Sequence, residues 1–486
     1  MNKNIANLEP QLVWTYFHKL TQIPRPSKNE GKAIDFVEQE GKRLGLETIK
    51  DKAGNVIIRK PATSGMENSK GVVLQGHLDM VPQKNSDKQH DFDKDPIEAY
   101  EEDGWVKANG TTLGADNGIG VAAALAVLAS NNLKHGPVEA LFTIDEETGM
   151  TGANALQPGI LQGDILINMD SEDEGELYVG CAGGTDANAV FTYMEEEFPE
   201  SYIAKKISLT GLKGGHSGMD IVLERGNANK LLFRLLKHLV AHEQVRLSTI
   251  EGGSLRNAIP REAFAIIAIP ESKLKDVEQT VEGYKNIFIN ELKNVEPDLS
   301  LKLEDTEKPH FVMDEMTQDD LINAIQGCPN GVIRMSTEMP GLVETSLNLA
   351  IVKSHNKEVE VKALIRSSVD TAKEDVESTL ESIFLLAGAH VWFDGQYPGW
   401  KPNMDSEILK TMQTVYKNKW GKTPEIKAIH AGLECGILGN AYPNWDMISF
   451  GPTINFPHSP DEKVNVETVQ KFWDFLVETL ENIPAK

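Results

Sequence analysis

The sequence predicts an α/β protein in which a mostly parallel mixed sheet, flanked by helices, is interrupted by an inserted α+β domain. Three observations support this prediction. Short apolar runs typical of buried strands lie near both ends of the chain, and several end in histidine or carboxylate residues. Helical patterns separate these runs, as in an alternating α/β fold. Between residues 187 and 399, by contrast, two-sided strands alternate with helices that have one apolar face.

Length and composition limit the number of domains, the possible partners and the cellular location that we expect. A chain of 486 residues is too long for one ordinary core, so two or more domains are expected. The net charge of −25 argues against nucleic acid or an anionic membrane as a partner. Three dispersed cysteines without a Cys-x-x-Cys pair fit a reducing compartment. The N-terminus lacks the apolar core of a signal peptide, and the longest apolar run, 121–129, is too short to span a bilayer, so we expect a cytoplasmic protein.

The first 60 residues predict two helices and a pair of strands. Helices at 10–21 and 27–44 are separated by Ile-Pro-Arg-Pro-Ser, in which the prolines stop the first helix and the serine can cap the second. Strands at 46–50 and 56–59 are joined by a Lys-Ala-Gly-Asn turn. These elements lead directly into the central apolar strand.

The stretch 71–83, Gly-Val-Val-Leu-Gln-Gly-His-Leu-Asp-Met-Val-Pro-Gln, predicts a buried strand that ends in a histidine and an aspartate. Residues two apart on an extended chain point the same way, so His77 and Asp79 are expected side by side at the carboxyl end of the strand. Open α/β sheets bind their ligands at this end. An imidazole beside a carboxylate suits a metal ligand and the group that orients it.

The following segments repeat this arrangement. Residues 84–110 are polar and turn-rich and are expected on the surface. Residues 112–120 open an alanine-rich helix, with Asp116 at its N-terminal mouth. Two more buried strands are predicted at 138–144 and 165–168. The carboxylates that follow these strands are Glu146, Glu147 and Asp170.

The middle of the chain is predicted to form one sheet covered by one layer of helices. Its predicted strands are 207–211, 264–269, 347–352 and 359–365. Its predicted helices are 227–243, 274–293 and 373–387. The strand–helix order recurs in the two halves of this segment, which is compatible with a doubled α+β unit, although no sequence repeat requires one.

After the middle segment the α/β pattern returns, and a strand at 447–450 leads into a loop that contains His458. We therefore predict a discontinuous catalytic domain made of residues 1–186 and 400–486. Residues 187–399 are predicted to form an inserted lid or dimerisation domain.

The strand ends and the helix mouth together offer a mixed set of nitrogen and oxygen ligands, which suits zinc and also cobalt or manganese. A carboxylate at a helix mouth can bridge two metal ions. One of two adjacent glutamates can bind a metal while the other acts as a general base. Taken singly, each residue has an ordinary interpretation, such as a packed histidine, a helix cap or a solvated acidic turn. Scattered surface charges, however, have no reason to gather at one edge of a predicted sheet.

Five motifs also resemble those of a known family. They are His77-Leu-Asp79, Gly114-Ala-Asp116-Asn117, Glu146-Glu147-x-Gly149, Asp170-Ser-Glu172 and His458-Ser-Pro-Asp-Glu462. Their order and spacing over essentially the whole chain are similar to those of the zinc aminoacylase/dipeptidase/carboxypeptidase family. Segments such as 211–218 and 429–436 resemble most closely the bacterial aminoacyl-histidine dipeptidases, which are carnosinase-like.

The resemblance implies a zinc-peptidase-like catalytic domain that binds two divalent metal ions, with zinc expected first and cobalt or manganese as alternatives. Asp116 would bridge the two ions. His77 and Asp170 would hold one ion, and Glu147 and His458 would hold the other.

The resemblance also implies roles for the residues around the metals. Asp79 would orient His77, and Glu146 would be the general base. Spacing alone does not decide which of the two adjacent glutamates is the base. The peptide bond between Asp116 and Asn117 would be cis, which is rare before any residue other than proline.

Four further residues are implied on the substrate side. His216, in Gly-Gly-His-Ser-Gly, matches a histidine that reaches the active site of the partner subunit and polarises the scissile carbonyl. Asn257 and Arg366 match positions that hold the substrate's carbonyl and terminal carboxylate, and a guanidinium suits a carboxylate. His430 is expected on the same rim, together with Glu434. Each also has an ordinary interpretation as a loop, cap or surface residue.

These features together predict a metallo-dipeptidase that hydrolyses unblocked dipeptides, preferably with a C-terminal histidine, and forms a homodimer through the inserted domain. A deacylase of N-acyl amino acids and a tripeptide aminopeptidase share the metal core and stay as alternatives. A metal-binding scaffold without activity is disfavoured, because Asp79 and Glu146 are both present.

Overall fold

The computed structural model describes residues 5–486; residues 1–4, where the first predicted domain begins, lie outside the described part. The chain divides into two compact units. The first consists of the residues up to Gly180, of Pro402–Ala428 and of Leu433–Lys486, and the second of Cys181–Lys401 and Ile429–Gly432. We predicted the first domain boundary after residue 186, which lies inside a strand that begins at residue 183. Residues 429–432, which belong to the second unit, were predicted in the catalytic domain.

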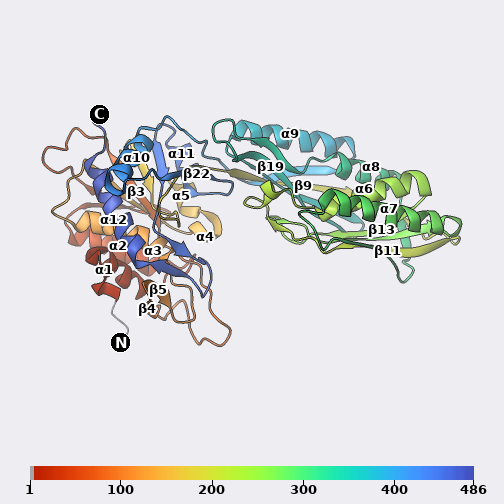
Figure 1. Ribbon diagram of the computed structural model, residues 1–486, viewed down its shortest axis with the longest axis horizontal. Helices are drawn as coiled ribbons and strands as arrows, with labels where there is room; N and C mark the ends of the chain where they lie inside the picture. The colour runs from red at the N-terminus through yellow and green to blue at the C-terminus, as the bar shows by residue number, and fades with distance from the viewer. Residues whose placement is uncertain (1–4) are drawn as a thin grey trace. The chain divides into compact units, whose positions relative to one another are not determined.

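The first unit is built on an eight-stranded sheet (Figure 1). In sheet order its strands are β1 (Glu47–Lys50), β2 (Val56–Lys60), β6 (Val138–Thr143), β3 (Val72–His77), β7 (Ile165–Asn168), β23 (Asp446–Ser449), β8 (Glu176–Cys181) and β22 (Glu425–Ile429). The four central strands β6, β3, β7 and β23 run parallel, whereas β1, β2 and β8 pair antiparallel with their neighbours. The prediction of a mostly parallel mixed sheet is confirmed.

Helices cover this sheet. Helix α3 (Ala115–Ala129) is buried along nearly its whole length, because its small side chains let it pack closely against β3 and β6. Helix α1 (Gln11–Thr21) packs on α3, and α10 (Glu407–Trp420) packs on α12 (Val466–Glu481) and β23. The unit also contains α2 (Gly31–Arg43), α4 (Glu146–Gly149), α5 (Thr151–Ala155) and α11 (Glu434–Ala441). No helix within residues 5–486 has both the length and the apolar character needed to cross a membrane.

The segment 84–110 is more structured than the sequence suggested. It contains a hairpin of β4 (Ala99–Glu102) and β5 (Trp105–Ala108). This hairpin pairs with β25 (Lys463–Asn465) and β24 (Ile454–Asn455) from the end of the chain. We predicted a polar, turn-rich surface segment here and did not predict the hairpin, in which Val106 and Ala108 alternate with less buried residues as in a one-sided strand.

The second unit is built on a nine-stranded antiparallel sheet. In sheet order its strands are β16 (Ser300–Asp305), β11 (Tyr202–Thr210), β15 (Ala263–Pro270), β13 (Arg246–Gly252), β19 (Val343–His355), β20 (Glu358–Ser367), β9 (Gly183–Thr192) and β21 (His390–Tyr397), with β18 (Gly331–Met335) paired to β19. The helices of the unit are α6 (Ala228–Glu243), α7 (Leu274–Leu292), α8 (Glu315–Gly327) and α9 (Asp370–Leu386).

This unit is doubled. Along the chain, β11, α6, β13, β15, α7 and β16 form one strand–helix–strand–strand–helix–strand group, and β9, α8, β19, β20, α9 and β21 form a second group of the same order. If the strands of each group are numbered 1 to 4 along the chain, both groups have the sheet order 4-1-3-2. The first group is inserted in the chain between β9 and α8 of the second. The two groups meet where β13 pairs with β19 at two residue positions.

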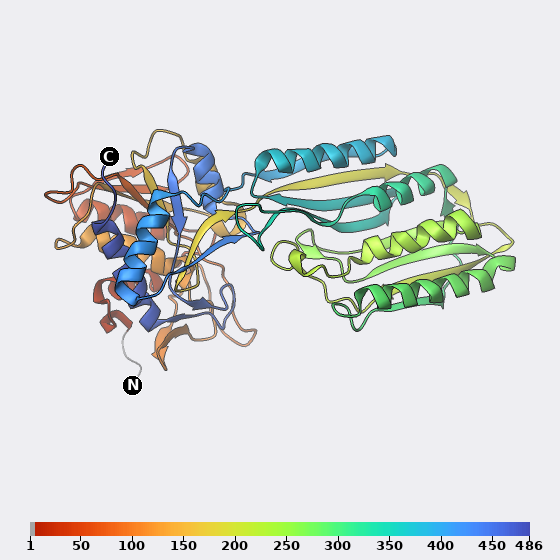
Figure 2. The same cartoon turned by 45° about the horizontal axis from the view of Figure 1, so that its top comes forward.

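One face of the nine-stranded sheet forms the core of the second unit. Alternate strand residues, such as Ile207 and Leu209 in β11, pack against apolar residues of the four helices, such as Leu232, Phe288 and Leu380. Figure 2 shows α6, α7, α8 and α9 lying along the strands. The predicted arrangement of one sheet and one helical layer is therefore confirmed.

Candidate metal centre and active site

The predicted metal ligands lie at the carboxyl edge of the first unit's sheet. Because β6, β3 and β7 are parallel, the residues that follow them emerge at the same edge. Helix α3 begins at this edge, and the loop after β23 returns to it. The residues gathered there are His77, Asp79, Asp116, Glu146, Glu147, Asp170 and His458.

Asp116 is shared between two groups of donor atoms. His77, Asp116 and Asp170 offer one group, and Asp116, Glu147 and His458 offer another, each with its ligand atoms within 4.8 Å of one another. One carboxylate oxygen, Asp116 Oδ1, lies 3.0 Å from His77 Nε2, and the other, Oδ2, lies 3.2 Å from His458 Nε2. This is the arrangement that a carboxylate bridging two ions requires.

The unpaired atoms at this site fit divalent metal ions. The buried oxygen Glu147 Oε1 has no hydrogen-bond partner, although buried polar atoms normally have one. The buried Asp170 Oδ1 has only a contact of 3.3 Å with His77 Nε2. Imidazole nitrogen and carboxylate oxygen are ligands that zinc, cobalt and manganese accept. The residues present therefore fit the metals that the resemblance implied.

The pKa shifts of Asp170 and His458 reflect how closely the carboxylates and imidazoles are packed at this site. Burial, with the neighbouring Asp116 and Glu147 carboxylates, raises the pKa of Asp170 to about 7, although His77 opposes the shift. Hydrogen bonds to Asp116 and Glu147 raise the pKa of His458 to about 11. Protons thus provide positive charge that bound cations can replace.

Asp79 connects the end of β3 to the glutamate pair. It is fully buried, and its Oδ1 lies 3.3 Å from His77 Nδ1. Its two oxygens also accept the backbone N–H groups of Glu146 at 3.0 Å and Glu147 at 3.2 Å, and Oδ2 accepts the Ser27 hydroxyl at 2.8 Å. One carboxylate therefore contacts the His77 imidazole and also fixes the backbone of both glutamates.

The two glutamates differ in their surroundings. Glu147 Oε2 lies 3.0 Å from His458 Nε2 and belongs to the donor group that contains Asp116. Glu146 is absent from both groups that contain Asp116, although it forms a third group of possible donors with His77 and Glu147. Burial raises the pKa of Glu146 well above its usual range, and Asp170 and Glu434 add to the shift while His77 opposes it. These differences support Glu147 as the ligand and Glu146 as the base.

His216 lies in the second unit with its imidazole in one tautomer. Its Nδ1 accepts the backbone N–H groups of Gly218 at 3.2 Å and Met219 at 3.1 Å. Burial and the Arg366 guanidinium lower its pKa, so the ring is held neutral. A neutral imidazole whose Nδ1 is an acceptor carries its proton on Nε2, and Nε2 is therefore a hydrogen-bond donor.

The other substrate-side candidates surround His216 in the second unit. Arg366 is buried and donates from Nε to Ser217 Oγ at 3.4 Å and from Nη1 to the Tyr397 hydroxyl at 3.1 Å. Ser217 N–H donates to the Asn257 carbonyl at 2.8 Å, and the Asn257 side chain is exposed. His430 packs its carbonyl against Gly218, where a Cβ would be only 2.2 Å away. The residues grouped by the resemblance are thus neighbours.

Comparison with known proteins identifies the family. The profile described as Peptidase family M20/M25/M40 matches residues 73–482. The chain belongs to this family. It is 49% identical over 482 residues, 99% of each chain, to a cytosol non-specific dipeptidase of Escherichia coli (strain K12). The family resemblance read from the motifs is thereby confirmed.

Solved structures of related proteins agree with this assignment. An aminoacylhistidine dipeptidase from Vibrio alginolyticus matches with a TM-score of 0.96 and 50% identity, covering 99% of this chain and 98% of the other. The aminopeptidase PepT from Bacillus cereus matches with a TM-score of 0.58 at 17% identity, covering 98% and 99% of the two chains. At that identity the second match shows a shared fold alone.

The sequence did not indicate the role of a buried arginine, Arg25, which connects two segments of the site by hydrogen bonds. In this member of the family, Arg25 donates from Nη1 to the carbonyls of Leu78 and Asp79, at 2.9 and 2.8 Å, and from Nη2 to the carbonyl of Gly114 at 2.5 Å. It thus joins the end of β3 to the loop before α3. The signal in the sequence was a charged residue between two prolines, which we interpreted as a helix break alone.

Glu462, the last residue of the motif that begins at His458, has no role implied by the sequence. Its buried carboxylate accepts the backbone N–H groups of Leu113, Gly114, Ala115 and Asp116 at 2.7 to 3.3 Å. These contacts fix the backbone that carries the shared aspartate. The peptide bond after Asp116 is cis, as the resemblance implied.

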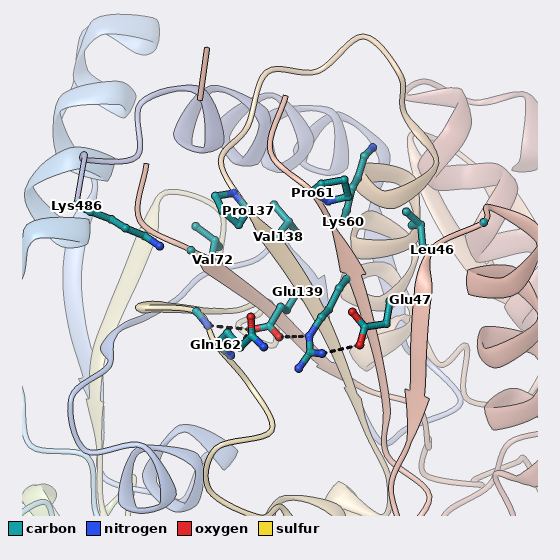
Figure 3. A pocket seen from close by; sticks show the side chains of 14 residues that line it. Leu46, Glu47, Lys60, Pro61, Val72, Pro137, Val138, Glu139, Gln162 and Lys486 are labelled. Carbon is teal, nitrogen blue, oxygen red and sulfur yellow. Dashed lines mark hydrogen bonds and ion pairs between the residues drawn. The ribbon is translucent and has the colours of Figure 1, made fainter. Parts of the chain in front are cut away.

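A pocket of about 510 Å³ lies at the opposite edge of the same sheet (Figure 3). Among its lining residues are the first residues of β3 and β6, and its Arg59 binds Glu139 and Glu47, each at 2.8 Å. Parallel sheets place their reactive residues at the carboxyl edge. We therefore assign no chemistry to this pocket.

Proposed function

We propose that this chain is a di-metal dipeptidase that hydrolyses unblocked dipeptides, best those with a C-terminal histidine. The observation that carries the proposal is the Asp116 carboxylate, shared between two donor groups beside a partly buried glutamate, Glu146. Relatives named as dipeptidases, about half identical along the whole chain, support the same activity.

Two divalent metal ions, zinc first and cobalt or manganese as alternatives, complete the proposed site. His77 and Asp170 would hold one ion and Glu147 and His458 the other, with Asp116 between them. When bound, such ions lower the pKa of a water molecule and polarise the peptide carbonyl. The metal identity rests on the donor chemistry of these five residues.

Glu146 is the proposed general base. Its raised pKa fits a group that accepts a proton from the attacking water and passes it to the leaving amine. Asp79 supports this role, because it holds the Glu146 backbone and the His77 ring in one arrangement.

The second unit is proposed to bind the substrate. His216 Nε2 would donate to the oxyanion that develops on the scissile carbonyl. Arg366 would bind the C-terminal carboxylate, since a guanidinium can engage a carboxylate with two hydrogen bonds. Asn257 would bind the substrate carbonyl. His430 would line the rim of the binding site.

We also propose a cytosolic homodimer formed through the second unit, on the resemblance and on the name of the Escherichia coli relative. Sedimentation velocity would establish the dimer. Inactive His216→Ala and Glu146→Gln proteins would then be mixed under exchanging conditions. Recovery of activity, to about a quarter of the wild-type level for random pairing of subunits, would show that His216 acts in trans. An established dimer without recovery would show that each chain acts alone.

The activity is tested with a substrate panel on protein of measured metal content. The panel contains β-Ala-His, Gly-His, Gly-Leu, an N-acetyl amino acid and a tripeptide. We expect metal-dependent hydrolysis of the dipeptides with the highest kcat/KM for Xaa-His. A preference for the acetylated substrate would contradict the proposal and favour a deacylase, and a preference for the tripeptide would favour an aminopeptidase.

A further inference from the structure

Glu434 is a buried carboxylate that the proposed mechanism does not use. It is the first residue of α11 and is completely excluded from solvent. Its Oε2 accepts hydrogen bonds from Gln75 Nε2 at 2.6 Å and from the Thr143 hydroxyl at 2.8 Å. Its Oε1 is buried and has no hydrogen-bond partner. An acceptor left unsatisfied in this way is expensive, unless a ligand supplies the donor.

Hydrogen bonds along a row of polar side chains hold the Glu434 carboxylate in place. Gln75 Oε1 accepts the Asn168 amide at 2.5 Å, and Asn168 Oδ1 accepts the Ser449 hydroxyl at 2.5 Å. The row therefore crosses the four parallel strands β6, β3, β7 and β23. Because the oxygen of the Gln75 amide is already engaged, its NH₂ group must point at Glu434. The two contacts at Oε2 both come from donors, which favour the ionised carboxylate, whereas burial raises the pKa of Glu434 to about 7. An ammonium at Oε1 would therefore also stabilise the charged form.

The position of Glu434 is next to the reacting groups. Its partner Gln75 precedes His77 by two residues and points to the same face of β3. Its other partner, Thr143, lies directly opposite His77 on β6. The charges of Glu434 and of the proposed base Glu146 act on each other. The carboxylate thus lies beside the proposed base and metal ligands, while both of its hydrogen-bond partners are neutral.

We propose that Glu434 binds the free amino group of the substrate, with Oε1 accepting a hydrogen bond from the ammonium. This inference rests on the proposed dipeptidase function and deepens it. The metal core treats a dipeptide and an N-acyl amino acid alike, and the difference between them is the ammonium. A fixed, desolvated carboxylate with one free oxygen recognises that group by charge and hydrogen bonding together.

The experiment compares two substrates of nearly the same shape on wild type and Glu434→Gln. Ala-His carries the ammonium, and propionyl-His carries hydrogen in its place. In wild type we expect kcat/KM to be at least about 10-fold higher for Ala-His. In Glu434→Gln we expect kcat/KM for Ala-His to fall about 10- to 100-fold, while that for propionyl-His changes less than about 3-fold. Metal content, measured by mass spectrometry, should be unchanged.

Four outcomes would overturn the inference. A parallel loss for both substrates, with metals retained, would mean that Glu434 positions Glu146 or His77 instead. Loss of metal would mean that it supports the ligands. Wild type that cleaves Ala-His no better than propionyl-His would show that the ammonium is not recognised. Wild type that cleaves neither would overturn the proposed function together with this inference.

Two further variants keep the test decisive. Glu434→Asp retains the charge, so it should keep a preference for Ala-His even if Glu434→Gln does not fold; equal losses on both substrates would count against the proposal. Glu40→Gln is the matched control, because Glu40 is also buried but is satisfied by Tyr16 and Arg43 in the helical layer. It should leave the ratio between the two substrates at the wild-type value.

Discussion

The two sheets of this protein place their functional candidates in different ways. In the first unit, β6, β3 and β7 are parallel and end at one edge, so the residues that follow them meet around Asp116. In the second unit, antiparallel strands end alternately at opposite edges, and no edge collects successive strand ends. Arg366 lies within β20, and His216 lies in a two-residue strand. The first arrangement gathers imidazoles and carboxylates at one sheet edge, whereas the second brings polar groups together from within a strand and from short segments between strands.

The largest expected effect lies in the first unit. Glu146→Gln should lower kcat by about 10³-fold, because a general base contributes roughly 10²- to 10⁴-fold. The bound metal should stay at the wild-type level, since Glu146 belongs to neither donor group around Asp116. Steady-state kinetics on protein of measured metal content check both statements. A variant that kept its metals and its rate would show that the base has been assigned wrongly.

The second unit should show a different signature. Arg366→Ala should lower kcat/KM for dipeptides by about 100-fold, because a charged hydrogen bond to the substrate carboxylate is lost. Arg366→Lys should recover only part of this loss, since a lysine cannot make the bidentate contact. Dipeptide amides, which lack the carboxylate, should be cleaved equally by wild type and Arg366→Ala. Equal sensitivity of acids and amides to the substitution would contradict this role.

Asp79 tests the connection between the ligands and the base. Asp79→Asn should weaken metal binding by about 30-fold, within the range found for residues that orient ligands. Titration against a competing chelator measures the affinity. Asp51→Asn is the control, because Asp51 also accepts several backbone N–H groups but in the turn between β1 and β2. Metal affinity that did not change in Asp79→Asn would separate Asp79 from the metal centre.

The smallest expected effect is a pH dependence of stability in the second unit. Burial lowers the pKa of His430 to about 3, and the Arg366 guanidinium adds to the shift. The unfolded chain binds a proton below pH about 6.5 and the folded chain does not, so the free energy of unfolding falls as pH decreases from about 6.5 toward 3. His430→Gln should remove about 1 kcal/mol of this loss between pH 7 and 5.5. Urea unfolding of both proteins at the two pH values measures it.

The sequence could predict most of the first unit because one rule connects apolar runs to chemistry. A buried parallel strand is a short apolar run, and its functional residue follows it directly, as His77 follows β3 and Asp170 follows β7. The contacts that assemble the site were not predictable in this way. Arg25 reaches Gly114 across 89 positions, and Glu462 reaches Leu113 across 349. Periodicity carries no information about pairs so far apart.

The second unit was predicted less completely. Its strongest strands and helices were found, but β13, β16, β21 and α8 were not, and β9 was cut by the predicted domain boundary. Edge strand β21 is largely exposed, and the exposed Trp392 lies between its two core-facing residues Val391 and Phe393, so the sequence shows no alternation of apolar and polar residues there. No pattern in the residues indicated that His216 and Arg366 would be neighbours, because an antiparallel sheet does not relate strand order to one functional edge. Only the family resemblance grouped them.

Strand β23 is central in its sheet yet is synthesised near the end of the chain. It lies between β7 and β8, and roughly 260 residues separate Cys181, the last residue of β8, from Asp446, the first of β23. A ribosome needs roughly 13 to 50 s for that length. Throughout that time the edge of β7 has no partner, and a strand edge left open invites aggregation. The sheet of the first unit is therefore completed only after the whole second unit has been synthesised.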